Sequence, residues 1–576
     1  MNPSQTAAQT CDKTPADMPT NTHPSMIELH EDCLAHGQWH APGDTRLPVL
    51  TVAQIRAVEA AAFAEIDSFV LMRAAGLRSA NRLLDHLAHR APHTSSVLVL
   101  AGPGNNGGDA HMVAGALHSA GLQVQLIDFA PASQGSADRQ RAVHWCREQG
   151  VKPCPANSTT LPPALPAHTV VVDGLLGIAG GRTLEGAMKR WVEHLAALRS
   201  TCPLQVFALD CPSGLNCDTG QVQGPCLPAD FTFTYLALKP GLLTNQGKSL
   251  AGQVWVDALG CETLLASGMA QNTFGPVAHA ASRSCHMARM PQRRHEHHKG
   301  NFGSLAVLGG EHGMVGACIL AARTALYLGA GRVALSLLSE HAQQFPDVQL
   351  QGQTPFVDAL CPEIMNKPLH DNLQFADTAI IGPGLGQSET ALEMLHTVMS
   401  QPKGLHMVWD ADALNLLALQ PALAEALRHY RTTFPEHALV LTPHPLEAAR
   451  LLGCSTADVQ ADRLGNARKL SERFHATVVL KGAGTVVCQG GRCEINLSGG
   501  PALGTAGSGD VLAGAIAALL GQGASEMDAA ALGVHLHGLS IVAQPGERED
   551  LLISHASEIA LRMKQTLNHL LNQSAR

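Results

Sequence analysis

The glycine-rich run Gly504–Gly514 (GTAGSGDVLAG) opens an apolar, helix-forming stretch of the chain. Backbone N–H groups at a helix amino end bind phosphate well, and glycine lets the backbone come close to it. Asp510 lies where its carboxylate could accept a proton from a hydroxyl group that attacks phosphorus. The run therefore predicts phosphoryl transfer, and the simpler alternative is that Asp510 only caps the helix.

Further turns in the same half of the chain could belong to this site. Lys481–Thr485 (KGAGT) follows an apolar run and could carry the phosphates of an adenosine nucleotide. His444 stands at the end of another apolar run, and glycine turns occur at Gly310–Cys318 and Gly382–Gly386. A single histidine is usually structural, so His444 is a candidate because it accompanies these turns.

The first half contains a second glycine-rich turn, Gly102–Ala110 (GPGNNGGDA), between an apolar run and a helical stretch. This order is typical of a phosphate site at a helix amino end, although a tight connection without a ligand would also contain glycines. Asn105, Asn106 and Asp109 are polar residues that a plain turn does not need. They favour a binding site, with Asp109 expected to cap the helix.

Two apolar runs of the first half end in a carboxylate. Asp173 closes VVVD, and Asp210 closes FALD and is followed by Ser213. Taken singly, each aspartate is best explained as a helix cap or a loop anchor. Because the carboxyl ends of parallel strands lie at one edge of a sheet, we expect these residues and Asn106 to converge over one crevice.

These candidates are positioned by two successive alternations of short apolar runs with helical patterns, which predict buried parallel sheets. The expected strands lie at 95–102, 168–174, 204–211 and 231–238, then at 303–310, 332–338, 376–384, 404–412, 437–444 and 476–484. The two halves share no repeated motif. The chain is therefore predicted to be α/β, as a fusion of two different three-layer domains.

Composition shifts set the expected boundaries. Residues 1–48 are rich in Pro, Thr, His and Asp and are predicted to form a disordered tail. Residues 49–265 form the first expected domain, and residues 298–572 form the second. Residues 266–297 are small, polar and basic without periodicity, so we assign them to a linker.

The overall composition excludes several classes of protein. Of the 576 residues, 45% are hydrophobic and 15% are charged, which supports sizeable cores. The formal net charge of −9 argues against nucleic-acid binding, and no apolar run is long enough to span a membrane. The polar amino terminus predicts a cytoplasmic protein. The 15 cysteines are scattered and never spaced Cys-x-x-Cys, so we expect reduced thiols and neither a disulfide framework nor a zinc site.

The motifs of the first half resemble a known family. GNNGGD at 104–109, VDGLLG at 172–177 and DCPSGLNCDTG at 210–220 occur in the order found in NAD(P)H-hydrate epimerases. The resemblance covers about residues 50–262. It implies a Rossmann-like domain that binds a hydrated nicotinamide nucleotide.

The same resemblance implies roles for individual positions. A potassium ion would be held by Asn106, Asp173 and Ser213, and these oxygen donors suit a hard cation. The implied substrate-binding positions are Asn105, Asn106, Gly107, Gly108, Asp109, Gly177, Ile178, Ala179, Gly180, Gly181, Arg182, Thr183 and Asp210. Asp210 is our candidate for proton transfer.

The second half carries a comparable set of motifs. The glycine-rich run occurs with HKGNFG at 298–303, WDADALN at 409–415, TPHPLEAARLLG at 442–453 and LKGAGTVV at 480–487. Together these motifs resemble the NAD(P)H-hydrate dehydratases of the ribokinase-like superfamily, over about residues 285–570.

This second resemblance implies two groups of ligand contacts and two co-reactants. The hydrate would be bound by Ala317, Gly384, Gly386, His444 and Asp510, with Asp510 as the catalytic base. The adenine nucleotide would be bound by Lys481, Gly482, Ala483, Gly484, Thr485 and Gly509. ADP would be the co-substrate, and Mg2+ would assist the dehydratase.

An epimerase followed by a dehydratase is the order found in bifunctional NAD(P)H-hydrate repair enzymes. Such an enzyme interconverts the R and S forms of hydrated NADH and NADPH. It dehydrates the S form at the expense of ADP, which gives AMP and phosphate. The hydroxyl at C6 of the hydrated ring is a poor leaving group, and phosphorylation makes its departure easy. We expect small-molecule substrates, no nucleic acid or membrane partner, and a homo-oligomer.

Other functions remain open from the sequence. The second half could be an ATP-dependent vitamin or sugar kinase of ribokinase type, with the first half as a nucleotide-binding regulator. The first half could also be a non-catalytic Rossmann-like module, which the presence of Asn106, Asp173 and Ser213 argues against. HEHHKG at 295–300 could be a transition-metal site, but it falls in the expected linker.

Overall fold

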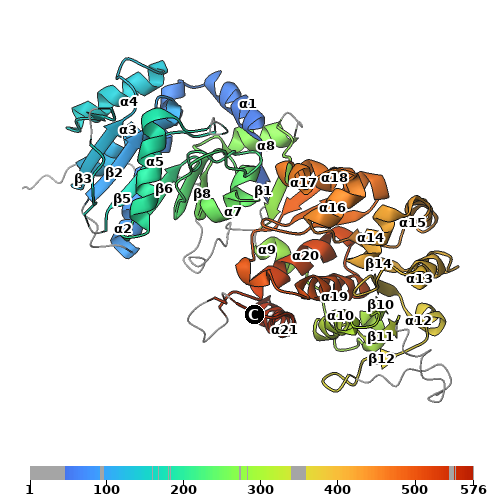
Figure 1. Ribbon diagram of the computed structural model, residues 1–576. Helices are drawn as coiled ribbons and strands as arrows, with labels where there is room; N and C mark the ends of the chain where they lie inside the picture. The colour runs from blue at the N-terminus through green and yellow to red at the C-terminus, as the bar shows by residue number, and fades with distance from the viewer. Residues whose placement is uncertain are drawn as a thin grey trace, which may run out of the picture.

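The computed structural model describes most of the chain after residue 45. The described residues are 46–90, 96–157, 160–166, 168–178, 181, 183–270, 274–281, 283–338, 358–543, 550–551 and 553–574. Two β-sheets divide these residues into two halves that lie side by side (Figure 1). Residues 1–45, which make up most of the expected tail, lie outside the described residues.

The first half is built on a seven-stranded sheet with the order β4-β3-β2-β5-β6-β7-β8. Its strands are β2 (Ser96–Ala101), β3 (Gln123–Asp128), β4 (Cys154–Pro155), β5 (Val170–Gly174), β6 (Gln205–Leu209), β7 (Phe231–Tyr235) and β8 (Gln253–Asp257). All neighbouring pairs are parallel. The strand order reverses direction at β2 and β5, and the crevice beside such a switch point is where α/β sheets bind ligands.

Helices cover both faces of this sheet. They are α1 (Val52–Phe63), α2 (Ser68–Arg90), α3 (Asn105–Ser119), α4 (Ala137–Glu148), α5 (Gly186–Arg199), α6 (Pro240–Leu243), α7 (Gly247–Leu250) and α8 (Glu262–Ala270). Val97 and Val99 of β2 belong to the core that includes α2 and α3, whereas Leu98 and Leu100 belong to the core around Trp191 of α5. This three-layer arrangement explains why β2 is apolar on both faces.

The second half is built on an eleven-stranded sheet with the order β1-β9-β18-β17-β16-β15-β14-β13-β10-β11-β12. Its strands are β1 (Arg46–Val49), β9 (Ala278–Ala281), β10 (Ser304–Gly309), β11 (Arg332–Leu337), β12 (Met365–Asn366), β13 (Thr378–Ile381), β14 (His406–Trp409), β15 (Leu439–Leu441), β16 (Thr477–Leu480), β17 (Val486–Gln489) and β18 (Arg492–Ile495). The strands from β16 to β12 are parallel, and β17 pairs antiparallel with both β16 and β18.

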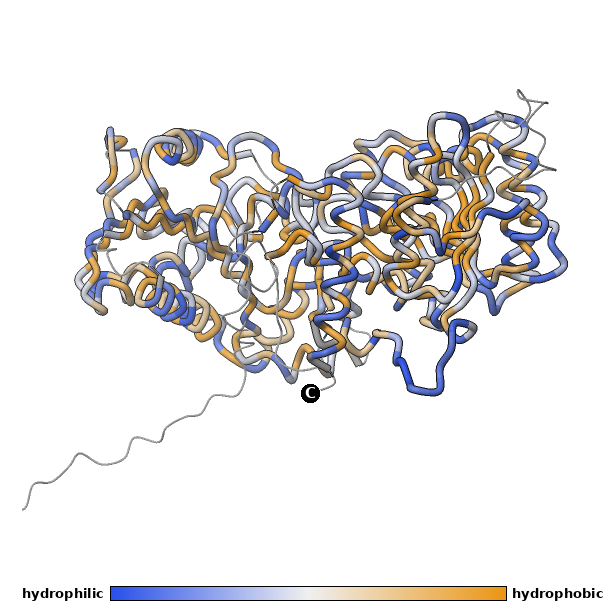
Figure 2. Tube along the Cα trace, turned by 90° about the horizontal axis from the view of Figure 1, so that it is seen from below, coloured by the Kyte–Doolittle hydropathy of each residue, from blue (hydrophilic) through white to orange (hydrophobic). Residues whose placement is uncertain are grey.

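This sheet is also covered on both faces. Its helices are α9 (Arg283–Ala288), α10 (Val315–Tyr327), α12 (Leu369–Phe375), α13 (Glu389–Met399), α14 (Asp412–Leu419), α15 (Pro421–Thr433), α16 (Pro445–Leu452), α17 (Thr456–Ala461), α18 (Arg463–Phe474), α19 (Ser508–Gly521), α20 (Glu526–Leu539) and α21 (Ala556–Ser574), with 3₁₀ turns at Lys299–Phe302 and Pro501–Leu503. Leu305 and Val307 of β10 pack with α10, α19, α20 and α21, whereas Ala306 and Leu308 face the core that includes α13 to α18. In Figure 2 the strands of this sheet are drawn mostly in orange, which marks hydrophobic residues.

The ten strands expected from the sequence are all present. They are β2, β5, β6 and β7 in the first half, and β10, β11, β13, β14, β15 and β16 in the second. The α/β class with two parallel sheets is therefore confirmed. Continuous apolar runs made these strands recognisable because each is buried on both faces.

The expected boundaries require correction. The assigned linker, 266–297, contains β9, which pairs with β1 and with β18 and so belongs to the larger sheet. It also contains α9, after which Arg289 forms an ion pair with Glu494 at 2.6 Å. β1 overlaps the expected tail but is also part of the larger sheet. β1 and β9 have four residues each and α9 has six, so these elements are too short to show the periodicity on which the prediction relied.

Two other expectations concern cysteine and histidine. Cys488 and Cys493 form a disulfide, which corrects the expectation of reduced thiols throughout. They face each other across the hairpin of β17 and β18, a pairing that the Cys-x-x-Cys criterion cannot detect. Within the described ranges, no group of three or more His, Cys, Asp or Glu side chains could hold a metal, and this includes HEHHKG at 295–300. No helix in the described part of the chain has the length and apolar character needed to cross a membrane.

Candidate active sites

The candidate residues of the first half gather at the carboxyl edge of the smaller sheet. β2, β5 and β6 are neighbours there. Asn106 follows β2 in the first turn of α3, Asp173 is the penultimate residue of β5, and Asp210 directly follows β6. Ser213 lies three residues after Asp210. The predicted convergence at the switch point is what the structure shows.

Asp173 and Ser213 form a buried, hydrogen-bonded pair. The Asp173 Oδ2 atom accepts from the Ser213 backbone N–H at 2.9 Å, and Oδ1 accepts from the Ser213 hydroxyl at 2.6 Å. Burial raises the pKa of Asp173, although the hydrogen bonds from Ser213 oppose this effect. The Leu176 N–H donates to the Ser213 hydroxyl at 2.9 Å. The loops after β5 and β6 are therefore tied together by this pair.

The side chain of Asn106 is buried without a hydrogen-bond partner among the described residues, at both its amide oxygen and its amide nitrogen. Its backbone carbonyl lies next to Gly174, where a Cβ would stand 3.1 Å from that oxygen. Buried polar atoms without partners are rare in proteins. Asn106, Asp173 and Ser213 offer amide, carboxylate and hydroxyl oxygens, which are the donors that a hard cation prefers, so their chemistry fits a potassium ion.

Asp210 has a backbone φ of +63°, a left-handed conformation that is costly for a residue with a side chain. Its Oδ1 atom accepts from the Lys239 ammonium at 2.7 Å, and Oδ2 accepts from the Ile178 N–H at 3.0 Å. Lys239 is buried and also donates to the Thr234 hydroxyl and the Tyr235 carbonyl. The surrounding structure thus fixes this carboxylate in one position.

Asp210 lines a cavity of about 440 Å³, together with Asp109 of α3 and Glu59 of α1. Burial, reinforced by the charge of Asp210, raises the pKa of Asp109 well above its usual range and raises the pKa of Glu59 less strongly. Asp109 therefore keeps its proton at a pH at which an ordinary aspartate is ionised. A proton donor and a proton acceptor on one cavity can carry out acid–base chemistry on a bound ring.

Asp109 does not cap the helix as expected. α3 begins at Asn105, its N-cap is Gly104, and no side chain caps it. Asp109 therefore lies beyond the first turn and faces the cavity. Asn105 is exposed and accepts a hydrogen bond from the Ser136 hydroxyl at 2.6 Å.

The glycines of GNNGGD are required by packing. A Cβ on Gly107 would collide with the backbone of Gly102, and a Cβ on Gly108 would meet the Met72 side chain at 2.6 Å. These contacts bring α3 close to the preceding turn and to α2. The glycines therefore determine the shape of the loop, whereas its Asn and Asp side chains are the groups that can make polar contacts to a ligand.

The loop after β5 is described only in part. A Cβ on Gly177 would stand 3.0 Å from Asp210 Oδ2 and 3.3 Å from the Asn106 side chain, so any ligand here lies against bare backbone. Ile178 lines the same cavity. Ala179, Gly180 and Arg182, which we expected to bind substrate, lie outside the described residues. Gly181 and Thr183 are exposed and do not line the cavity.

The candidate residues of the second half gather at the carboxyl edge of the larger sheet. Gly382–Gly386 follows β13, Asp410 follows β14, and Lys481 follows β16. His444 comes three residues after β15. α19 packs near β13 and β14, and Gly509 at its amino end lies beside Asp410, so Asp510 also stands at this edge.

Lys481 and Asp410 form an ion pair with an Nζ–Oδ1 distance of 2.7 Å. Gly509 lies against this pair, since a Cβ there would be 3.3 Å from Lys481 Nζ and 3.5 Å from Asp410 Oδ2. Burial would lower the pKa of Lys481, but Asp410 and other carboxylates raise it overall. A charged ammonium therefore stands next to the N–H groups that begin α19, which is a favourable place for a phosphoryl group.

Asp510 lies in the first turn of α19, whose N-cap is Gly507 with a φ of +85° and no side-chain cap. The capping alternative for Asp510 therefore has no support. Burial, followed by the charge of Asp410, raises the pKa of Asp510 to about 7, and Lys481 offsets only part of this rise. A carboxylate with this pKa is well suited to act as a general base near neutral pH.

His444 has a structural role that the sequence analysis did not anticipate. It caps α16, because its Nδ1 atom accepts from the N–H groups of Leu446 at 3.1 Å and Glu447 at 3.2 Å. Glu447 completes the capping box by accepting from the His444 N–H at 2.7 Å. Burial lowers the pKa of His444 and raises the pKa of Glu447 to about 7. The imidazole thus lines the site as a neutral, fixed ring.

The remaining candidates for the hydrate site lie beside the loop after β13. The Gly386 N–H donates to Asp412 Oδ2 at 2.9 Å, and the Gly384 carbonyl accepts from the Glu311 N–H at 2.6 Å. A Cβ on Gly386 would collide with the Glu311 carboxylate. Ala317 lies in the first turn of α10, whose N-cap Met314 packs against Gly384, but it is outside the large cavity described next.

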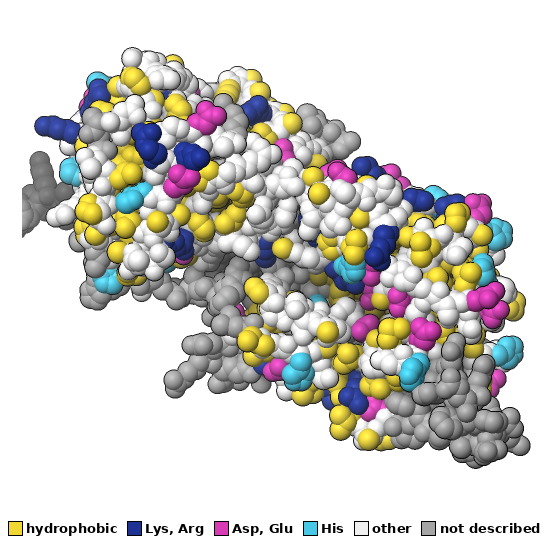
Figure 3. Space-filling model, viewed as in Figure 1, with side chains coloured by type: hydrophobic (Ala, Val, Ile, Leu, Met, Phe, Trp, Pro, Cys, Tyr) yellow, Lys and Arg dark blue, Asp and Glu magenta, His cyan; other side chains and the backbone are white. Residues whose placement is uncertain are grey.

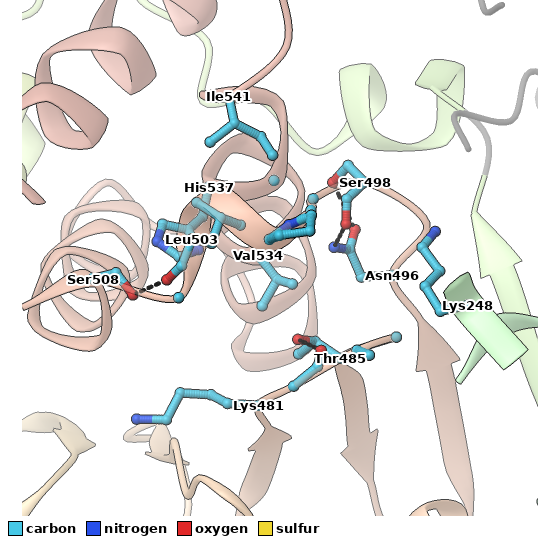
Figure 4. Close-up of a pocket in the computed structure, with 18 of the residues that line it drawn as sticks. Lys248, Lys481, Thr485, Asn496, Ser498, Leu503, Ser508, Val534, His537 and Ile541 are labelled. Atoms are coloured by element: carbon cyan, nitrogen blue, oxygen red, sulfur yellow. Dashed lines mark hydrogen bonds between the residues drawn. The ribbon is translucent and has the colours of Figure 1, made fainter. Parts of the chain in front are cut away.

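A cavity of about 820 Å³ opens beside the ion pair of Lys481. All the candidate nucleotide residues line it, namely Lys481, Gly482, Ala483, Gly484, Thr485 and Gly509. His444 lines it too, whereas Ala317, Gly384, Gly386 and Asp510 lie outside its lining. Figure 4 shows Lys481 and Thr485 on one side of the cavity, with the apolar side chains of Val534 and Ile541 across from them. Charged and apolar ends of this kind fit a nucleotide's phosphates and base.

Comparison with known families and proteins decides between the interpretations. The family described as NAD(P)H-hydrate dehydratase matches residues 305–559, and the family described as YjeF-related protein N-terminus matches residues 68–241. The bifunctional NAD(P)H-hydrate repair enzyme Nnr of Escherichia coli (strain K12) is 37% identical over 78% of this chain and 80% of that protein. This chain belongs to the bifunctional NAD(P)H-hydrate repair enzyme family.

Other relatives carry the same description. The repair enzyme of Coxiella burnetii is 33% identical over 87% of this chain and 96% of its own, and that of Leishmania braziliensis is 33% identical over 82% and 85%. A solved ADP/ATP-dependent NAD(P)H-hydrate dehydratase from Bacillus subtilis, co-crystallised with ATP and Mg2+, is 24% identical. It covers 50% of this chain and 96% of its own, with a TM-score of 0.39.

Four ionisable residues of this repair-enzyme family member line or support the sites but were not predicted. Asp410 and Glu447 were accessible to sequence reasoning, because one ends an apolar run as Asp173 does and the other lies three residues after His444. Lys239 and Glu59 carried no such signal. The topology alone brings them to the same cavity as Asp210.

Proposed function

We propose that this chain is an enzyme with two activities, the epimerisation of hydrated NADH and NADPH and the ADP-dependent dehydration of the S form. The observation that carries the proposal is that one chain holds two separate built sites. Asp210 is held by Lys239 at one, and Asp510 stands beside the pair of Lys481 and Asp410 at the other. Membership of the repair-enzyme family supports the same assignment.

At the second site, Asp510 takes the proton of the C6 hydroxyl as its oxygen attacks the β-phosphorus of ADP. The bond from that phosphorus to the bridging oxygen breaks, and AMP is released. Lys481 and the N–H groups that begin α19 neutralise the charge on the transferring group. The C6–O bond then breaks with loss of a proton from C5, phosphate leaves, and the C5=C6 double bond of NAD(P)H is restored.

At the first site, Asp109 gives its proton to the C6 hydroxyl as the C6–O bond breaks and water leaves, and Asp210 takes a proton from a water molecule as it adds to the opposite face of C6. Asp210, whose carboxylate accepts a hydrogen bond from the Lys239 ammonium, is the acceptor, and Asp109, whose pKa is raised well above its usual range by burial, is the donor. Only one configuration at C6 presents its hydroxyl to Asp510, so inversion at the first site supplies the second.

Two cations complete the proposal. K+ would be held by Asn106, Asp173 and Ser213, where its charge would fix the loops after β2, β5 and β6 against one another. Mg2+ stays a prediction from the sequence, and such an ion binds largely through the phosphates of its nucleotide. Location in the cytoplasm and a homo-oligomeric state also stay predictions, and the second is tested by the mass of the protein in solution.

The function is tested by supplying each epimer of hydrated NADH with ADP, and then with ATP. We expect NADH absorbance to return from both epimers, with release of AMP and inorganic phosphate when ADP is used. A ribokinase-type vitamin or sugar kinase would leave a phosphorylated organic product instead. If NADH returned from the S form alone, the first half would have no epimerase activity.

The pH dependence of dehydration follows from Asp510. We expect kcat/KM to be low in acid, to rise as the pH passes about 7, and to level off above it, because the base acts in its ionised form. The measurement is kcat/KM for the S form at saturating ADP across this range. Glu447→Gln should keep the rise, because Glu447 supports the His444 cap and takes no proton from substrate. A flat profile would rule out Asp510 as the base.

A further inference from the structure

The nucleotide cavity of the second half is not built by the second half alone. Lys248, Ser249 and Gly252 of the first half also line it. They lie in α7 and the turn after it, on the side of the first half that faces the second (Figure 1). The site is therefore incomplete without the first half.

The segment from α6 to α7 contacts the nucleotide turn directly. The Asn245 N–H donates to the Ala483 carbonyl at 3.1 Å. Gly484, with a φ of +65°, packs so closely against Leu243 that a Cβ would collide with the Leu243 carbonyl. These contacts fix the position of α7 relative to the residues that would hold the nucleotide.

Lys248 lines the cavity from the side away from Lys481 (Figure 4). Its ammonium donates to the Leu497 carbonyl at 2.5 Å, and no carboxylate pairs with it in the described part of the chain. Burial without such a partner lowers the pKa of Lys248 to about 8. An ammonium has three N–H donors, so it can bind another acceptor in the cavity while keeping its bond to Leu497.

We propose that Lys248 binds the adenine nucleotide in the dehydratase site, so that the epimerase half completes the nucleotide pocket of the other half. This inference rests on the proposed function for the identity of the nucleotide. Phosphoryl transfer belongs at the end of the cavity that holds Lys481 and Gly509. Lys248 therefore meets the adenosine end, where ribose hydroxyls and base nitrogens are the available acceptors.

The segment also connects the two sites along the chain. Lys239, which holds Asp210, directly precedes α6, and Lys248 follows nine residues later in α7. A variant of Lys248 that merely disturbed the segment would therefore impair the first site as well. Loss of nucleotide affinity with an unchanged epimerisation rate distinguishes a binding role from a structural one.

The test uses the full chain with Lys248→Met, Lys248→Arg and, as a matched control, Lys189→Met on the exposed face of α5. ADP binding is measured by calorimetry without substrate, and KM for ADP and kcat are measured separately. We expect Lys248→Met to weaken ADP binding and to raise KM about tenfold, the effect of one hydrogen bond to a charged group. kcat at saturating ADP and the epimerisation rate should stay near wild type, and Lys248→Arg should restore much of the affinity.

Each result has one meaning. Wild-type ADP affinity in Lys248→Met would overturn the inference, as would equal losses in Lys248→Met and Lys189→Met. A wild-type protein that binds ADP but returns no NADH would overturn the proposed function, while the effect of Lys248→Met on ADP binding would still be measured. The two failures are therefore separable.

Discussion

Replacing Asp510 with asparagine is expected to lower the rate of dehydration by about 10²–10⁴-fold, the usual contribution of a general base. Asparagine has nearly the same shape, and Asp510 makes no hydrogen bond or ion pair with any described residue, so the fold of the α19 start should persist. Lys481 and Gly509, which hold the nucleotide in our proposal, are unchanged. ADP binding should therefore stay close to wild type, or tighten slightly because a negative charge is removed.

The measurement is single-turnover dehydration of the S form together with calorimetric titration of ADP. Asp371→Asn is a matched control. Asp371 also lies in the first turn of a helix, α12, but its side chain is exposed and does not line the nucleotide cavity. It should leave the rate unchanged. An Asp510→Asn enzyme that keeps more than about a tenth of the wild-type rate would exclude a base with the usual contribution.

Much of this architecture was predictable because its physical causes are local. A parallel strand that is covered on both faces must be apolar at successive positions, as in β2 and β10. Ligand sites of α/β sheets lie at the carboxyl ends of such strands, so the candidates Asp173, Asp210 and Lys481 could be located from the sequence alone. The surface is less informative, since the face shown in Figure 3 mixes basic, acidic and histidine side chains.

The features that escaped prediction depend on contacts between distant segments. β1 and β9 have four residues each and are separated by more than two hundred positions, yet they pair at the edge of the larger sheet. Lys239 and Glu59 reach Asp210 from different elements. Lys248 reaches the other half of the molecule altogether. Contacts between residues this far apart in the sequence leave no periodicity or spacing from which they could be predicted.

A second large loss of activity is expected at the cation site of the first half. Asp173 is the one full negative charge among Asn106, Asp173 and Ser213, so Asp173→Ala should release a bound K+ and cripple epimerisation. It also leaves the Ser213 N–H without an acceptor, which typically costs about 1–3 kcal/mol of stability. Asp173→Asn removes the charge and keeps one of the two acceptor oxygens that Ser213 contacts, so it disturbs the loops less than alanine does. Both variants should lose epimerisation, whereas Asp85→Asn on the exposed face of α2 should not.

The kinetic signature separates a failed first site from a failed protein. With a mixture of epimers and ADP, the Asp173 variants should return NADH in two phases, a fast phase from the S form and a slow phase set by spontaneous inversion of the R form. The fast phase should match wild type, because Asp510 and Lys481 lie in the other half. Added K+ should accelerate the slow phase in wild-type protein freed of the ion but not in Asp173→Asn. A single fast phase in the variants would mean that inversion does not depend on Asp173, and that the charge of Asp173 serves the fold alone.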